Sequence, residues 1–346
     1  MKGSVRNVFP GNNSKDGFYS HYQSGLGGME KVYILKGGPG TGKSTFMKEL
    51  AADFAERGHD VELWHCSSDC NSLDGVLIPD LKTAVVDGTS PHIVEPRYPG
   101  VKEEILNFAD FWDDERIGKQ KERICGLTDR ISRSFYEAYA HLAAAGEADG
   151  ELLALRWGTG GAEKAEAIAS EIFGREEPLV RHLFGAAITP EGIKDVTLDL
   201  CRPLKKRWFL RGKRGLGQQR CMEYLLGQGM RRGMAVEIYH GALDPEEILL
   251  LIFPEPGIAV AAVENLPRGE MREGDRIISF GGKGDRKETE LWAEKRREEA
   301  IAAAVERIAH AHALHDELEA CYIPAMDFEK VAELQKNLRR KITKKV

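Results

Sequence analysis

Apolar residues follow two different periods in the first part of the chain. Residues 32–36 form a short apolar run closed by glycines, which is typical of a buried strand in a parallel sheet. Apolar residues then recur at helical spacing, at Phe46, Met47, Leu50, Phe54 and Ala55. We therefore predict an amphipathic helix over 43–57 that ends at Gly58. Strands predicted at 61–64 and 83–86 complete a strand–helix–strand order, which indicates a parallel sheet with right-handed crossovers.

The second part of the chain repeats this scheme. Its apolar runs predict strands near 207–211, 234–239 and 258–263, and a helix near 218–230. Long helical segments are predicted after each set of strands. Residues 101–145 are helix-rich with a break near Gly118 or Gly126, residues 287–321 form one long helix, and residues 327–343 form another.

The two parts also match residue by residue. Sliding the chain against itself by 175 positions aligns residues 6–87 with 181–262 without a gap, and 19 of the 82 pairs are identical. About one identity in seventeen is expected from average amino-acid usage. We interpret the match as an internal duplication with its boundary near 174–178, which gives two domains, 1–174 and 175–346.

Composition excludes several classes of protein. The chain has 346 residues, 42% of them hydrophobic and 30% charged, which is typical of a globular protein and not of a disordered one. Its apolar runs are too short to span a bilayer, and its first residues lack the apolar stretch of a signal peptide. Six cysteines in so long a chain do not indicate a disulfide scaffold, so we expect reduced thiols and a cytoplasmic location.

A glycine-rich segment between the first predicted strand and helix carries the clearest chemical signal. The segment Gly37, Gly38, Pro39, Gly40, Thr41, Gly42, Lys43, Ser44 and Thr45, here named the first glycine loop, fits the pattern GxxxxGK[ST] of a P-loop. Glycines let the backbone wrap around phosphate oxygens, which the backbone amides and the helix N-terminus bind. Lys43 is expected to reach the β- and γ-phosphates of ATP, and Ser44 to bind Mg²⁺.

A P-loop site also needs an acidic residue at the end of a neighbouring strand. Asp87, which closes the strand predicted at 83–86, is our first candidate and would hold Mg²⁺. Asp69 is the competing candidate and could orient an attacking water or an acceptor hydroxyl. The alternative for either residue is an Asp that only caps a turn.

The second half keeps the glycines of the loop but lacks the residues that are expected to bind ATP and Mg²⁺. In the segment Arg211–Arg220, here named the second glycine loop, Gln218 and Gln219 stand at the positions of Lys43 and Ser44. Ala262 stands at the position of Asp87. A neutral Gln cannot supply the charge of a lysine, so we predict a degenerate copy that keeps its fold. An anion held there by Lys213, Arg214 and Arg220 remains an alternative.

The chain resembles bacterial tandem P-loop proteins that are labelled as ATPases or nucleotide-kinase-like proteins. The segments that carry the resemblance are 9–22, 36–45, 65–92, 183–192 and 314–330. Among these segments, only the first glycine loop is diagnostic of a chemical function. The resemblance implies that ATP binds there. Members of that family often carry a usable loop in both halves, and this chain departs from the pattern at 213–220.

Several weaker patterns leave alternatives open. Arg6 and Arg181 occupy equivalent positions, and either could be an arginine finger on a γ-phosphate, although an ion pair within each half is the simpler interpretation. Four arginines share one helical face and could grip an acceptor phosphate or form a solvated stripe; they are Arg116, Arg123, Arg130 and Arg133. The basic tail 339–346 leaves a nucleic-acid or protein contact open, although a net charge of −6 argues against nucleic acid in general.

Two groups of residues resemble metal ligands. His65, Cys66 and Cys70 lie close in sequence, but no second cysteine pair completes a tetrahedral set, so we do not expect zinc there. A second group shares one helical face, and a half-buried face is the simpler interpretation of it; its members are His312, His315, Asp316 and Glu319.

The sequence as a whole predicts an α/β protein made of duplicated P-loop domains, with one competent site for ATP and Mg²⁺ in the first half. Hydrolysis with water as the acceptor is the first hypothesis. A small-molecule or nucleotide kinase is the second, and a non-catalytic nucleotide-dependent switch is the third. A ring-forming ATPase motor is weaker, because it expects Asp-Glu after the strand and Gly88 follows Asp87 here.

Overall fold

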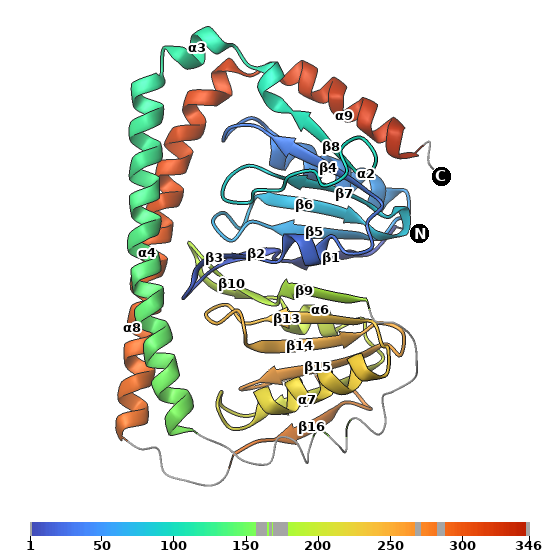
Figure 1. Cartoon of the computed structure of the whole chain (residues 1–346), viewed down its shortest axis with the longest axis vertical. Coiled ribbons are helices and arrows are strands. Elements are labelled where there is room, and N and C mark those ends of the chain that lie inside the picture. Colours follow the sequence, from blue (N-terminus) through green and yellow to red (C-terminus); the bar gives the residue numbers. More distant parts are fainter. Residues whose placement is uncertain are drawn as a thin grey trace.

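The structure is a computed structural model that describes residues 2–156, 165, 168, 179–266, 271–281 and 288–343. It is an α/β protein with two similar halves, each of which contains a six-stranded mixed sheet flanked by helices (Figure 1). The boundary predicted at 174–178 lies outside the described residues.

The two sheets have the same strand order. The first sheet runs β1-β5-β6-β7-β4-β8, with β1 at Val5–Val8, β4 at Lys31–Lys36, β5 at Val61–His65, β6 at Leu73–Ile78, β7 at Thr83–Asp87 and β8 at Glu103–Asn107. The second runs β9-β13-β14-β15-β12-β16, with β9 at Val180–Phe184, β12 at Lys206–Arg211, β13 at Val236–His240, β14 at Ile248–Phe253, β15 at Ile258–Val263 and β16 at Arg276–Ser279.

The prediction of wholly parallel sheets is wrong, because each sheet contains one antiparallel strand. β6 runs antiparallel to β5 and β7, and β14 runs antiparallel to β13 and β15. The connection from β6 to β7 is only the short helix η1 (Pro79–Leu81) and Lys82, and so short a link can join only antiparallel neighbours. β6 is buried along its whole length, but Asp74 and Gly75 interrupt its apolar run, so it lacks the pattern that predicts β4 and β7.

The predicted strands and helices beside the glycine loops are confirmed. Each loop follows a central parallel strand, β4 or β12, and opens a 14-residue helix, α2 (Lys43–Glu56) or α7 (Gln218–Arg231). Each half also has a hairpin, β2–β3 (Gly11–Ser14 and Gly17–Ser20) or β10–β11 (Ala186–Thr189 and Gly192–Asp195), and a short helix after it, α1 (Tyr22–Gly25) or α6 (Thr197–Cys201).

Two long helices run alongside both sheets (Figure 1). α4 (Lys121–Leu155) and α8 (Glu288–Tyr322) are 35 residues each, and they pack antiparallel, with Leu127 near Leu318 and Arg297 paired with Asp149. The predicted helix-rich segment 101–145 differs in part, because it begins with β8 and the short helices η2 (Phe108–Phe111) and α3 (Asp114–Gly118). The helical structure is interrupted after Gly118, where α3 ends, and α4 runs without a break through Gly126.

The last helix returns to the first half. α9 (Phe328–Thr343) follows η3 (Ile323–Ala325) and belongs by sequence to the predicted second domain. Val331, Leu338 and Ile342 of α9 nevertheless pack into the core around α2, and Gln335 donates a hydrogen bond of 2.9 Å to the carbonyl of Phe46. The end of α8 is thereby brought to the carboxyl ends of the strands in the first sheet.

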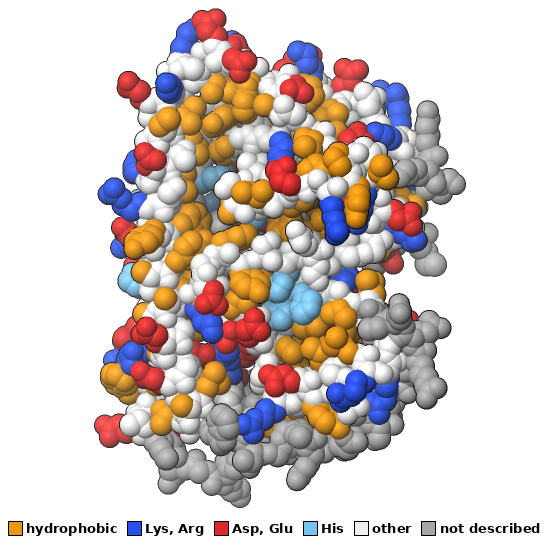
Figure 2. Space-filling model, in the orientation of Figure 1, with side chains coloured by type: hydrophobic (Ala, Val, Ile, Leu, Met, Phe, Trp, Pro, Cys, Tyr) orange, Lys and Arg blue, Asp and Glu red, His pale blue; other side chains and the backbone are white. Residues whose placement is uncertain are grey.

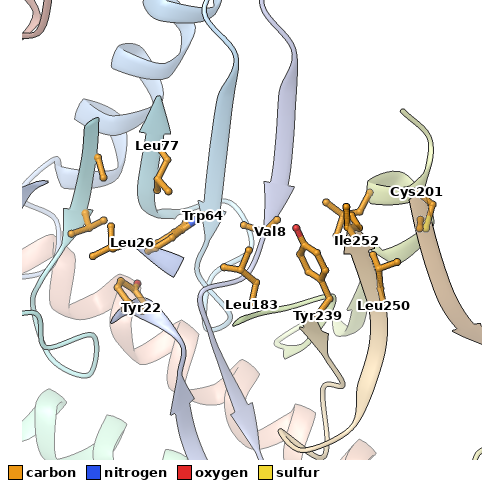
Figure 3. Packing of buried hydrophobic residues seen from close by; sticks show 14 of the residues in the cluster. Val8, Tyr22, Leu26, Trp64, Leu77, Leu183, Cys201, Tyr239, Leu250 and Ile252 are labelled. Carbon is orange, nitrogen blue, oxygen red and sulfur yellow. The ribbon is translucent and has the colours of Figure 1, made fainter. Parts of the chain in front are cut away.

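The two halves share a core at their junction. Val8, Trp64, Leu183 and Tyr239 belong to one buried cluster drawn from both sheets (Figure 3). Phe9 and Phe184 pair as an isolated antiparallel bridge between β1 and β9. Histidine side chains are visible near the junction on the face shown in Figure 2, beside hydrophobic patches.

Among the described helices, none combines the length and the apolar character needed to cross a membrane. All six cysteines lie in described residues and have free thiols, and four of them are buried.

Candidate functional site

The first glycine loop lies at the edge of the sheet where the parallel strands end. Gly40 and Gly42 have φ angles of 68° and 90°, in the left-handed region that favours glycine. Gly42 caps α2, so the first amides of that helix point toward the loop. The positive end of a helix dipole and free backbone amides make this position suited to an anion.

Lys43 is the one cationic residue of the loop, and it is buried. Its side chain is 9% exposed, and Nζ donates hydrogen bonds of 2.9 Å and 2.7 Å to the carbonyls of Gly37 and Gly38. Nζ also lies 3.6 Å from Oδ2 of Asp87. The lysine charge is therefore fixed inside the loop, next to one carboxylate.

The structure distinguishes between the two acidic candidates. Asp87 is the last residue of β7 and is paired in register with Leu35 of β4, which places it beside the start of the loop. Its Oδ1 accepts a hydrogen bond of 2.8 Å from the amide of Thr89, and the Thr89 hydroxyl donates to the carbonyl of Gly37 over 3.1 Å. Asp69 likewise accepts a hydrogen bond from the amide two residues on, that of Asn71, and it also accepts one from the Ser72 hydroxyl. What sets Asp87 apart is that Lys43 lies beside it.

The remaining loop residues have different surroundings. Ser44 is half-buried at the start of α2, and its Oγ accepts a hydrogen bond of 3.0 Å from the amide of Leu73 at the start of β6. Thr41 is buried and donates to the carbonyl of Gly38, Pro39 is half-buried, and Thr45 is exposed. Lys43, Ser44 and Asp87 thus lie at one sheet edge, and Asp69 belongs to the neighbouring β5–β6 connection.

Sequence reasoning missed the residues that contact the loop from α8 and α9. The amide of Gly40 donates a hydrogen bond of 3.2 Å to Oε1 of Glu319. A Cβ atom on Gly38 would lie 2.8 Å from the ring of Tyr322, and one on Gly42 would lie 3.2 Å from the ring of Phe328. Glu319 had been assigned only to a half-buried helical face. All three residues lie in segment 314–330, which carries part of the family resemblance, but nothing in that segment predicts a contact with the loop.

A second carboxylate lies near Asp87 at the same edge. Asp74, on β6, is 4% exposed, and burial raises its pKa to about 6, with a further increase from the negative charge of Asp87 and an opposing effect of His92. Burial likewise raises the pKa of the Cys66 thiol well above its usual range. This edge of the first sheet therefore concentrates buried acidic groups around the loop.

The second glycine loop repeats the backbone and part of the contacts of the first. Gly215 and Gly217 have φ angles of 92° and 111°. Gln218 donates a hydrogen bond of 2.5 Å to the carbonyl of Gly212, and Oε1 of Gln219 accepts one of 3.0 Å from the amide of Ile248. Under the 175-residue offset, these are the hydrogen bonds of Lys43 with Gly37 and of Ser44 with Leu73. The two glutamines thus make the hydrogen bonds that Lys43 and Ser44 make in the first loop, but they do not supply the positive charge of Lys43.

An open cavity of about 950 Å³ lies over the second glycine loop. Two of the three cations named as anion ligands are engaged with carboxylates: Lys213 pairs with Glu290 and Glu294, and Arg214 pairs with Asp149, Asp244 and Glu247. Arg220 lines the cavity. Further acidic side chains line the cavity, at Asp195, Asp199, Glu223, Glu246 and Glu264. This surrounding charge disfavours a phosphate at the second loop.

Arg6 and Arg181 form one ion cluster across the junction of the halves. Arg181 lies 2.8 Å from both Glu62 and Glu237, and Arg6 contacts Glu237 and lies 3.6 Å from Glu62. The simpler interpretation, an ion pair within each half, is therefore incomplete, because the pairs also join the halves. Both arginines are held at the junction by these carboxylates.

The other arginines and the basic tail have surface positions. Arg123, Arg130 and Arg133 are exposed on α4, and Arg116 donates to the carbonyl of Pro324. In the tail, Arg339 pairs with Asp53 and Lys341 with Glu104, while residues 344–346 lie outside the described part of the chain.

No protein-family model, curated protein or solved structure matches the chain. The arrangement of Lys43, Ser44 and Asp87 is therefore the ground on which a function can be argued.

Proposed function

We propose that the chain is an ATPase that binds MgATP at the first glycine loop and hydrolyses it with water as the acceptor. The observation that carries the proposal is the position of Lys43. Its charged Nζ lies inside a strand–loop–helix turn, 3.6 Å from a carboxylate at the end of the neighbouring strand. This combination of loop, lysine and acidic residue is what binding of a nucleoside triphosphate requires.

The residues at the loop fit a triphosphate and its metal ion. The left-handed glycines and the N-terminus of α2 provide backbone amides for phosphate oxygens. The Ser44 hydroxyl and the Asp87 carboxylate are hard oxygen ligands at the same edge and would hold Mg²⁺. When bound, Mg²⁺ supplies positive charge that stabilises the negative charge of a transferring phosphoryl group.

Within this site the chain's own groups have separate tasks. Lys43 neutralises charge on the terminal phosphate, and its hydrogen bonds to Gly37 and Gly38 keep the ammonium group in position. Asp87 lies beside Lys43 and orients Thr89, which in turn holds the carbonyl of Gly37. Positioning and electrostatics account for most of the catalysis in phosphoryl transfer.

A nucleotide-dependent switch is a second candidate, favoured by one observation. Glu319 and Tyr322 at the end of α8 contact Gly40 and Gly38, and α8 also packs along α4 into the second half. A nucleotide that displaced Glu319 would change the packing of this long helix. The switch and the ATPase use the same loop and differ in whether turnover occurs.

The chain itself offers the sharpest test of the ATPase. Lys43→Gln copies the natural residue at position 218, which keeps the hydrogen bond to the loop carbonyl without the charge. With γ-labelled MgATP we expect release of labelled phosphate by the wild-type chain and a loss of at least about 100-fold in Lys43→Gln, with an unchanged melting temperature.

The matched control is Gln218→Ala at the equivalent position, which should leave turnover unchanged. Addition of a pool of nucleosides, nucleotides and sugars separates hydrolysis from a kinase, because a kinase would move the label to an acceptor. ATP binding without turnover would favour the switch. Undiminished binding and turnover in Lys43→Gln would overturn the assignment of the loop.

A further inference from the structure

Three buried side chains with different metal-binding atoms meet at the edge of the first sheet. Cys66 directly follows β5, Asp74 is the second residue of β6, and His92 lies in the connection after β7. Because β6 is antiparallel, its start lies at the edge where β5 and β7 end. The Cys66 sulfur, a carboxylate oxygen of Asp74 and a ring nitrogen of His92 all lie within 4.8 Å of one another.

The polar atoms of this group are buried together and contact mainly one another. Cys66, Asp74 and His92 are 9%, 4% and 8% exposed. Nδ1 of His92 makes no hydrogen bond, and the ring of His92 stacks on that of Tyr22. The Asp74 carboxyl interacts within the group, with Nε2 of His92, the Cys66 thiol and the Tyr22 hydroxyl. A buried polar atom without a partner is energetically unfavourable, and so is a buried carboxylate that no cation compensates.

We propose that Cys66, Asp74 and His92 form a binding site for a divalent transition-metal ion of the zinc class, with three protein ligands and one open position. A thiolate, an imidazole and a carboxylate are the ligand types that Zn²⁺ takes, whereas Mg²⁺ takes oxygen ligands. His92 Nε2 already lies 3.4 Å from Asp74 Oδ2, a separation suited to two ligands of one tetrahedral ion with bonds of about 2.0–2.3 Å.

The ligand set differs from the one that sequence proximity suggested. Of the neighbouring candidates, His65 contacts the carbonyl of Cys70 through Nδ1 and Asn7 through Nε2. Cys70 is not part of the buried group. Only Cys66 is common to both sets, and its partners come from two other segments of the chain. The folding of β6 between β5 and β7 is what brings these partners to it.

The second half lacks this ligand set, as it lacks the residues of the proposed ATPase site. Under the 175-residue offset, Gly241 and Leu249 stand at the positions of Cys66 and Asp74. A set of residues needed only for folding would be expected in both similar halves. The metal site is thus a specific property of the first half and lies beside its glycine loop, where Leu73 joins β6 to Ser44.

Cobalt binding tests the site without any nucleotide. The full chain is stripped of metal and titrated with Co²⁺, which gives a thiolate-to-cobalt charge-transfer absorption when a cysteine is a ligand. We expect one equivalent of Co²⁺ to produce this absorption together with the visible bands of a tetrahedral ion, and Zn²⁺ to displace it. Cys66→Ser should abolish the charge-transfer absorption, and His92→Gln and Asp74→Asn should weaken Co²⁺ binding at least about tenfold.

Two control variants make the outcome decisive. Cys70→Ser removes the neighbouring, less buried thiol and should leave the absorption unchanged, and Lys43→Gln should also leave it unchanged because that residue belongs to the ATPase proposal alone. His92→Gln and Asp74→Asn keep the Cys66 thiol, so their weakened binding is interpretable even if Cys66→Ser does not fold. No charge-transfer absorption in the folded wild-type chain, or its loss in Cys70→Ser, would overturn the proposal.

Discussion

The backbone amide of Gly40 donates a hydrogen bond of 3.2 Å to Oε1 of Glu319. A carboxylate from the end of α8 therefore occupies a loop amide that the proposed function assigns to a phosphate oxygen. The same Oε1 lies 3.7 Å from Nδ1 of His315, one turn earlier in α8. Under the proposed function, Glu319 and a nucleotide would compete for this donor, and binding of ATP would be linked to the position of α8.

Glu319→Ala is expected to raise the affinity for ATP by about 3- to 10-fold, because it removes a competing charged acceptor from the loop. Titration with a fluorescent ATP analogue measures the change. Glu317→Gln is the control, since Glu317 lies exposed on the same helix. Equal affinities in Glu319→Ala and the wild-type chain would show that Glu319 does not restrict the loop.

Asp87→Asn is expected to lower the rate of ATP hydrolysis by at least about 100-fold, because the amide is a poor ligand for Mg²⁺ and leaves Lys43 without its carboxylate. The dependence of the rate on Mg²⁺ concentration should shift upward in the same variant. A steady-state phosphate-release assay over a range of Mg²⁺ concentrations measures both effects.

Asp69→Asn is the matched comparison for Asp87→Asn. Its carboxylate caps the turn at Asn71 and Ser72, so the variant should lower the melting temperature and leave the rate of hydrolysis within about threefold of the wild type. A larger loss of rate in Asp69→Asn than in Asp87→Asn would reverse the assignment of the two residues.

Elements with a periodic pattern of apolar residues, or with glycines at their ends, can be predicted from the sequence. The strand before Gly37, the helix after Lys43 and the two helices near the C-terminus are local features, and the structure has them. β6 has no continuous apolar run, because Asp74 and Gly75 interrupt it, so the local pattern does not predict it. The prediction of a parallel sheet was therefore wrong at one strand in each half.

The contacts from distant segments could not be predicted from local pattern. Glu319 reaches Gly40 only because η3 and α9 fold back onto α2, which depends on the packing of Val331 and Leu338 in the first core. The meeting of Cys66 with Asp74 and His92 depends on the antiparallel direction of β6. Both relationships follow from tertiary packing, and a single sequence carries little signal of it.

Arg181→Met is expected to lower the free energy of unfolding by about 3–5 kcal/mol, because it leaves Glu62 and Glu237 with an uncompensated buried charge at the junction. The Arg181 guanidinium, together with that of Arg6, lowers the pKa of the Glu62 carboxyl in spite of its burial, so this carboxylate is charged at neutral pH. Urea unfolding followed by circular dichroism measures the loss.

Arg57→Met is the control for Arg181→Met, since Arg57 pairs with Asp53 on the surface of α2 and should change the free energy of unfolding by less than about 1 kcal/mol. If the two variants lost similar stability, the junction cluster would have no special role in joining the halves.

The stability of the chain is expected to fall as the pH drops below about 6.5, because histidines are held neutral at the junction. Burial, with a smaller effect of the neighbouring imidazoles, lowers the pKa of His21 to about 3 and that of His240 to about 4, and burial also lowers the pKa of His182. The three rings stack on one another. In the unfolded chain these groups take up protons near pH 6.5.

The sign of the effect follows from proton uptake. Since the folded state binds fewer protons between pH 6.5 and 4, the stabilisation is complete above pH 6.5 and is lost as the pH falls, by about 1–2 kcal/mol for each of His21 and His240 at pH 5. Asp74, with its pKa raised to about 6, acts in the opposite direction over part of this range, so the total slope is smaller than the histidines alone would give. A variant that lacks one of these histidines isolates its contribution to the pH dependence of stability.

His21→Gln should make the free energy of unfolding less dependent on pH between 6.5 and 4.5, because one group that titrates only in the unfolded chain is removed. Urea unfolding at a series of pH values measures the slope for the variant and the wild type. His310→Gln, at an exposed position on α8, should leave the slope unchanged. A slope in His21→Gln equal to that of the wild type would mean that His21 is protonated in the folded chain, which its burial against His182 and His240 argues against.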